Sequence, residues 1–350
     1  MTIIIFILVL LVCVLAHEWG HFFAARTSGL LVEEFGFGIP PRLWAKKKGE
    51  TVYSVNALPI GGFVKIAGEN GVEEGVPIER QIEYKPWYVQ GFVLVAGVVA
   101  NIILALVLFT IAYSIGMPTT TDGGTPTIVS ISPGLPAEKA GIAVGDTVER
   151  ISAGGISPDT LDTDAIHTLI QNHTGSVVVD YVHDGIKKET TLEPVMHGSD
   201  RLIGVAIEPV AVVKMGIGKA IGSAWFQVKN VISAIWYTLG SLLGQLFGGT
   251  KTSVAGLVGP VGLAHEIGGA ARIGLAYLIA FTAAISVNLA VINILPFPAL
   301  DGGRLLVVLL EAIFRRKFSK KIVGLIHTAG FVLLLGLMLV LTVGDVRRLL

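Results

Sequence analysis

The hydrophobic residues of this chain gather in four long runs that polar segments separate. The runs cover residues 1–25, 91–116, 274–300 and 322–344, and each is close to the roughly 20 apolar residues or more that a helix needs to cross a bilayer. Glu18 is the only Asp, Glu or Lys within them, so each run can close its backbone hydrogen bonds as a helix at little cost. The pattern predicts a polytopic α-helical membrane protein with about four transmembrane helices.

The first run resembles a signal peptide in position but not in its flanks. No basic residue precedes Ile3, and no small-x-small cleavage site ends the run. We therefore expect this run to be a mature transmembrane helix.

A segment of different character lies between the second and third runs, over about residues 122–210. Residues 127–131 and 177–182 alternate apolar and polar positions, as half-buried strands do, and Gly and Pro punctuate the segment. The string Pro136-Ala-Glu-Lys-Ala-Gly141, followed by Val144-Gly-Asp-Thr-Val-Glu-Arg-Ile151, resembles the PDZ modules of bacterial proteases. The fold class that we predict therefore includes an inserted small α/β PDZ-like domain.

In PDZ modules an exposed edge strand accepts an extended peptide, and a backbone nest holds the carboxylate of that peptide. The matching loop and strand in this chain would be Leu202, Ile203, Gly204 and Val205. The alternative is a module that only blocks or spaces, since a PDZ fold need not bind a chain terminus.

Two further segments are too apolar for free loops. Residues 215–250 place Trp and Phe near Lys, Gly and Ser, which favours an interfacial amphipathic helix over a fifth span. Residues 56–68 are β-rich and contain several Gly, which predicts a membrane-associated β-rich loop that must be buried against protein. The expected division is a first membrane part (1–116), a PDZ-like domain (117–212), an amphipathic helix with a linker (213–273) and a second membrane part (274–350).

Basic residues set the expected orientation. Residues 26–90 and the segment between the third and fourth runs are rich in Lys and Arg, and such segments stay on the cytoplasmic side. The N-terminus and the PDZ-like domain would then lie outside a bacterial inner membrane. Arg347 and Arg348 argue mildly against this orientation, because it places them outside as well.

Composition agrees with lipid as a partner and excludes nucleic acid. The chain is 52% hydrophobic and 15% charged, with a mean hydropathy of +0.72 and zero formal net charge, so it lacks the basic footprint of a nucleic-acid-binding protein. Its single cysteine, Cys13, can form no internal disulfide, and we expect it to serve packing.

The first run ends with the string His17-Glu18-Trp19-Gly20-His21. Positions i and i+4 of a helix share one face, so both imidazoles can reach one zinc ion while Glu18 approaches a metal-bound water. A carboxylate inside an apolar run costs roughly 2.5 to 3.5 kcal/mol on insertion scales, and a divalent metal is the simplest compensating partner. The pattern favours a metal-activated hydrolase over an incidental cluster at the helix end.

A catalytic zinc site takes a third protein ligand and keeps one open position. Asp301 is the best candidate, because it would end the third run on the same side of the membrane as His21, after a stretch that Pro296 and Pro298 break. Asn288 and Asn293 could hydrogen-bond a substrate backbone, although helix-to-helix contact explains Asn288 equally well. The remaining histidines are poor candidates for the third ligand: His167, His173, His183, His197, His265 and His327.

Together these motifs resemble the site-2 protease family, specifically the branch of the bacterial regulator of sigma-E protease. The resemblance runs nearly from end to end, on the strings His17 to His21, Glu34 to Gly38, Gly61 to Lys65, Gly259-Pro260 and Asn293 to Gly302. Members of this branch often carry two PDZ modules, whereas this chain has room for one, and Val98 stands where the family often has Pro.

The resemblance implies specific roles. One zinc ion per chain would be held by His17, His21 and Asp301, with Glu18 as the catalytic base. Asn293, Pro296 and Pro298 would line the substrate path, and the loop that contains Gly61 and Gly62 would pair with an unwound substrate. The expected partners are single-span membrane proteins, such as anti-sigma factors already cut outside the membrane, and remnant signal peptides.

Two other classes of function compete with the protease. In a zinc transporter the same three ligands would bind cargo, but transport needs no general base next to His17, and the runs show no inverted repeat. In an inactive scaffold built around the PDZ-like module, an intact Glu18 would have no purpose.

Overall fold

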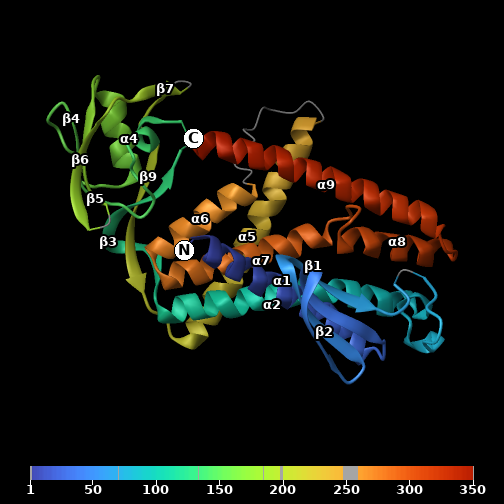
Figure 1. The fold of residues 1–350 in the computed structure, drawn as a ribbon. Coiled ribbons are helices and arrows are strands. Elements are labelled where there is room, and N and C mark those ends of the chain that lie inside the picture. The colour runs from blue at the N-terminus through green and yellow to red at the C-terminus, as the bar shows by residue number, and fades with distance from the viewer. Residues whose placement is uncertain are drawn as a thin grey trace. The chain divides into compact units, whose positions relative to one another are not determined.

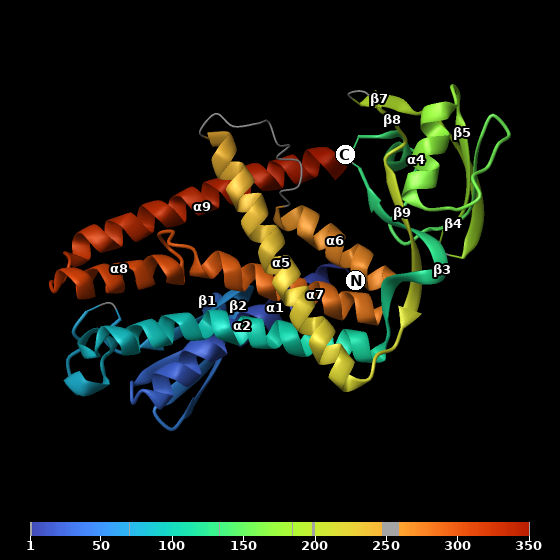
Figure 2. The ribbon, with the colours of Figure 1, turned by 180° about the vertical axis from the view of Figure 1, so that it is seen from behind.

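The computed structural model describes residues 2–69, 71–132, 134–183, 185–197, 200–246 and 259–349. The chain divides into two compact units, one made of Met1–Ser114 with Gly216–Leu350 and the other of Ile115–Met215 (Figures 1 and 2). The first unit is helical and is called the membrane core below. The second unit is called the inserted module.

Four of the described helices are long and apolar enough to cross a membrane, which confirms the predicted polytopic helical fold. Their outward faces are apolar, as lipid requires: Phe331, Val332 and Leu339 of the last helix are all more than half exposed. The four helices are α1 (Thr2–Thr27), α2 (Trp87–Ile115), α7 (Leu275–Ile294) and α9 (Lys320–Leu349).

Two more helices surround these spans. Helix α5 (Ile217–Leu246) crosses α7 and packs against it (Figure 2), and it falls outside the helices that qualify as spans. Helix α6 (Pro260–Ile273) packs against α1, α7 and α9, and its Ile267 is fully buried with Val9 and Cys13. The sequence predicted only a linker in the region of α6.

The third span is shorter than the sequence predicted. Helix α7 ends at Ile294, residues 295–300 form a turn, and Asp301 begins a new helix, α8 (Asp301–Phe314). The cause is local: Pro296 and Pro298 lack the N–H groups that a continuing helix would use. Asp301 therefore does not end the third span but starts the next helix.

A β-hairpin follows α1 and confirms the β-rich segment. Strands β1 (Val32–Lys48) and β2 (Thr51–Ile66) pair antiparallel with several register irregularities. The hairpin is fixed to α1 by aromatic contacts, since the ring of Phe22 lies 5.4 Å from that of Phe35 and 6.2 Å from that of Tyr53. Two short 3₁₀ turns, η1 (Ile78–Arg80) and η2 (Ile82–Tyr84), precede α2.

The inserted module is a five-stranded sheet with strand order β6-β5-β4-β3-β9 and the helices α3 and α4. Alternate residues of β5 are buried, as the period-2 pattern predicts, and Ile151, Val179 and Ile207 belong to one apolar core. The elements are β3 (Met117–Ile131), α3 (Pro136–Lys139), β4 (Thr147–Ala153), α4 (Thr163–Asn172), β5 (Val177–His183), β6 (Ile186–Leu192), β7 (Val195–His197), β8 (Asp200–Leu202) and β9 (Val205–Val213).

Candidate metal centre

Helix α1 brings two imidazoles together, as the i, i+4 spacing predicts. The Nε2 atoms of His17 and His21 lie 3.1 Å apart, and their rings meet edge to face at 4.7 Å. Both side chains are buried, with residue exposures of 9% and 8%. Two buried imidazole nitrogens so close together call for a shared positive partner.

Asp301 supplies the third atom of the cluster. Its Oδ2 lies 2.9 Å from His17 Nε2 and 3.2 Å from His21 Nε2. A tetrahedral zinc ion with bonds of about 2.0–2.1 Å would separate its ligand atoms by roughly 3.3 Å, so the triangle is close to the size that the metal requires. Two neutral nitrogens and one carboxylate oxygen are also a ligand set that zinc accepts. The three residues could therefore hold a zinc ion.

Burial and charge act in opposite directions on Asp301. Burial raises the pKa of the carboxyl, but hydrogen bonds from the imidazoles of His17 and His21, and the positive charge of these rings when they are protonated, outweigh it and hold the pKa below its ordinary value. The carboxylate form, which is the form that ligates a metal, is thus the one that this environment favours.

The backbone of α2 orients one of the two imidazoles. The Nδ1 of His21 lies 2.8 Å from the carbonyl oxygen of Val93, so Nδ1 carries the proton and Nε2 keeps its lone pair for a metal. Helix α2 can approach this closely because residue 97 is Gly, where a Cβ would lie 2.4 Å from His21 Nε2 and 2.8 Å from His17 Cε1.

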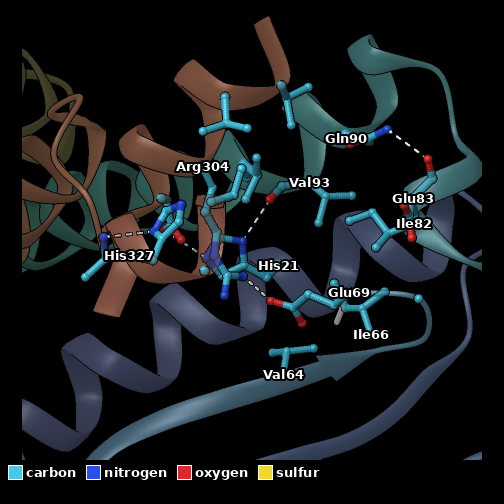
Figure 3. Close-up of a pocket in the computed structure, with 18 of the residues that line it drawn as sticks. His21, Val64, Ile66, Glu69, Ile82, Glu83, Gln90, Val93, Arg304 and His327 are labelled. Atoms are coloured by element: carbon cyan, nitrogen blue, oxygen red, sulfur yellow. Dashed lines mark hydrogen bonds and ion pairs between the residues drawn. The ribbon is translucent and has the colours of Figure 1, made fainter. Parts of the chain in front are cut away.

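Glu18 and the three candidate ligands line one cavity of about 820 Å³. The cavity wall also includes residues 62, 63, 64 and 66 of β2 and residues of α2, α8 and α9 (Figure 3). Gly62 lies against the catalytic candidate, since a Cβ there would be 2.8 Å from Glu18 Cγ. A carboxylate beside a metal site on the wall of a cavity is placed to handle the proton of an attacking water.

Ion pairs join the elements around this cavity. Arg304 of α8 pairs with Glu69, and Lys320 of α9 pairs with Glu83 at 2.6 Å. All four residues line the cavity, so its polar rim links the segment after β2 with the helices that follow Asp301.

The predicted substrate residues lie in different places. The Nδ2 of Asn293 is 3.4 Å from His17 Nε2, so its amide adjoins the metal cluster, whereas Asn288 is exposed on α7 and does not line the cavity. Pro296 and Pro298 line a second, apolar cavity of about 370 Å³ between α8 and α9. Of the two hairpin glycines, Gly62 lies against Glu18, whereas a Cβ at Gly61 would meet no heavy atom within 4 Å.

The predicted peptide-binding segment of the inserted module runs from the end of β8 into β9. Its carbonyls are partly used within the module, because Ile203 accepts the N–H of Ala137 and Gly204 accepts that of Ser132. Gly204 has φ +88, which favours glycine. Val205 begins β9, an edge strand of the five-stranded sheet.

Sequence reasoning missed several residues near the metal cluster. Gly97 gave no local signal, because its role depends on a neighbouring helix. The side chain of Asn101, one turn further along α2, is fully buried and has no hydrogen-bond partner among the described residues. His327 looked like an ordinary packing residue, yet its Nδ1 accepts the N–H of Ala299 at 2.9 Å, and both residues line the cavity.

Comparison with known proteins decides the family. The family model of peptidase family M50 matches residues 5–337. The chain belongs to peptidase family M50. A relative from Clostridium acetobutylicum is 35% identical over 346 residues, covering 99% of this chain and 97% of the relative, and one from Clostridium perfringens is 33% identical over 347 residues, covering 99% and 98%.

Both clostridial relatives carry zinc metalloprotease names. The zinc metalloprotease RasP of Geobacillus kaustophilus is 29% identical over an alignment of 429 positions, with 99% of this chain and 98% of that protein covered. Since this chain has 350 residues, RasP carries additional residues that have no counterpart in this M50 protein. The M50 protein is a multi-pass zinc metalloprotease of the membrane, its cofactor is zinc, and its substrates are membrane proteins.

Proposed function

We propose that this M50 protease hydrolyses peptide bonds within or beside the transmembrane segment of single-span membrane proteins. The observation that carries the proposal is the placement of the site: His17, Glu18 and His21 stand on α1, a span-forming helix, and face one cavity together with Asp301 of α8. Anti-sigma-factor-like proteins that another protease has cut outside, and remnant signal peptides, are the substrates that this placement suits.

The metal cluster and the polar residues beside it have proposed roles. His17, His21 and Asp301 would hold zinc, which when bound acidifies water and polarises a carbonyl. Glu18 takes the proton of the attacking water and returns it to the leaving amine. Asn293, whose amide adjoins the cluster, donates to a substrate carbonyl.

A helical substrate hides its carbonyls, so we propose that it unwinds and adds as a strand beside β2. Residues 62, 63, 64 and 66 of β2 line the metal cavity, and a two-stranded sheet leaves backbone groups at its edges unpaired. The adjoining apolar cavity shares Val307, Phe318, Val323 and His327 with the metal cavity, so apolar side chains of an unwound membrane segment have a place next to the cluster.

The orientation is proposed from charge. The basic segments after α1 and after α8 would face the cytoplasm, with the N-terminus and the PDZ-like module outside, where the segment at Leu202–Val205 would take a peptide. The native Cys13 is fully buried, so labelling by a maleimide reports on an introduced cysteine. A membrane-impermeant maleimide should label Lys188→Cys, and not Lys47→Cys, in intact cells; the reverse result would refute this orientation.

The deciding experiment measures zinc content and cleavage of a single-span substrate for purified wild type and Glu18→Gln. If Glu18 is the base, the variant keeps about one zinc per chain and loses about 10²–10⁴-fold in rate. His17→Ala is the matched control and should lose the metal. Equal rates for wild type and Glu18→Gln would contradict the proposed mechanism, and zinc retention by His17→Ala would contradict the proposed ligand set.

A further inference from the structure

The carboxylate of Asp301 is held by a short turn rather than by a long helix. Residues 295–300 link α7 to α8, and Asp301 is the first residue of α8. The turn is internally hydrogen-bonded, with Leu300 N–H to Phe297 O and Gly303 N–H to Leu300 O. A displacement of this turn would therefore move the carboxylate relative to the two histidines of α1.

The residue two positions before Asp301 has an unusual backbone. Ala299 has φ 77, in the left-handed region that residues with a Cβ rarely adopt. A conformation of this kind persists when surrounding contacts over-determine it. The contact that fixes Ala299 comes from outside the turn.

That contact is made by the last helix. The Nδ1 of His327, on α9, accepts the N–H of Ala299 at 2.9 Å, and His327 stands in the wall of the metal cavity (Figure 3). Because Nδ1 is the acceptor, the neutral ring carries its proton on Nε2.

One turn further along α9, Gly330 lets the helix reach the turn. A Cβ at residue 330 would lie 2.5 Å from Pro298 Cβ and 2.7 Å from Pro298 O. Helix α9 therefore contacts two consecutive residues of the turn: it packs closely against Pro298 and is hydrogen-bonded to Ala299.

We infer that His327 is a positioning residue for the metal-binding carboxylate: through the Ala299 N–H it fixes the turn that presents Asp301 to His17 and His21. The inference rests on the proposed role of Asp301 as a ligand. Outer contacts of this kind typically change metal affinity by 10–100-fold. His327 thus acts on zinc binding without touching the metal.

The test measures zinc affinity by competition with a chelator, in the full-length protein in detergent. His327→Leu removes the acceptor and should weaken zinc binding at least tenfold, whereas His327→Asn, whose Oδ1 can take the place of Nδ1, should retain most of the affinity. Leu325→Ala is the matched control, since Leu325 is 71% exposed on the same helix and lines neither cavity. Wild-type affinity in His327→Leu, or an equal loss in His327→Asn, would overturn the inference.

A second measurement separates positioning from a packing defect. Glycine adopts φ near +77 without strain, so Ala299→Gly added to His327→Leu should recover part of the lost zinc affinity. No recovery would mean that the loss came from packing and would overturn the proposal. Asp301→Asn tests the underlying site separately: if it binds zinc as wild type does, Asp301 is not a ligand and the proposed metal site fails, whatever His327 does.

Discussion

At the scale of residues, the metal cluster depends on a glycine that lets a neighbouring helix approach as much as on the ligands themselves. The two histidines of α1 could be found from the sequence, because their spacing alone puts them on one helical face. Gly97 and His327 could not be found, because each acts from a helix that is distant in sequence. Asp301 lay between these cases: the prolines before it signalled a break, but only the structure shows that it starts a helix.

Gly97→Ala should disrupt the metal cluster. The added methyl would lie 2.4 Å from His21 Nε2, and a displacement of about 1 Å in a ligand costs on the order of 10²-fold in function. We expect zinc affinity to fall at least tenfold, measured as metal retained after dialysis. Gly336→Ala is the matched control, since nothing lies within 4 Å of that site. Normal zinc retention in Gly97→Ala would show that the close approach of α2 is not required.

Gly62→Ala should affect catalysis and not metal binding. Its Cβ would lie 2.8 Å from Glu18 Cγ and 3.0 Å from Val14 Cγ1, so the side chain of Glu18 must shift. We expect kcat to fall roughly 10- to 100-fold with zinc content unchanged. Gly61→Ala meets no atom but has φ +81, so it should cost about 1 kcal/mol of hairpin stability and lower kcat less than Gly62→Ala does. A larger kcat loss for Gly61→Ala than for Gly62→Ala would contradict this assignment.

At the scale of elements, hydropathy located the spans but not the helices that brace them. The four spans could be predicted because lipid requires long apolar helices. Helix α6 was missed because it is short and rich in small residues, and its burial arises from α1, α7 and α9 rather than from its own pattern. The hairpin could be predicted as β-rich, whereas its anchoring to α1 through Phe22, Phe35 and Tyr53 follows only from the folded contacts.

Asp345 should anchor α6 to α9. Its buried carboxylate accepts the N–H groups of Gly259 and Gly262 at 3.2 and 2.8 Å, so it caps the N-terminus of α6 from another helix. Asp345→Ala should lower the free energy of unfolding in detergent by about 2 kcal/mol, and Asp345→Asn by less, because the amide keeps an acceptor. Val346→Ala, at an exposed neighbour, should change little; an equal loss in that variant would refute the anchoring role.

At the scale of the whole molecule, the chain leaves the membrane core and returns to it through paired strands. Met117 of β3 is paired with Val213 of β9 in antiparallel register, so the two connections of the inserted module lie about 5 Å apart at that point. The module has its own apolar core and about the size of an independent domain. Its similarity to PDZ domains rests on sequence motifs.

Excising the module should therefore leave the metal site intact. We predict that a short Gly-Ser linker between Ile115 and Gly216 gives a protein that still binds about one zinc, because every proposed ligand lies in the membrane core, and that isolated residues 115–215 unfold cooperatively. Zinc content of the first protein and thermal unfolding of the second check these outcomes; loss of zinc would refute the independence of the two units. Cleavage then distinguishes the roles of the module. If the module excludes intact substrates, the enzyme without the module cuts a single-span protein that still carries its outer domain. If the module recruits substrates, the enzyme without the module cuts an already trimmed substrate more slowly than the wild type does.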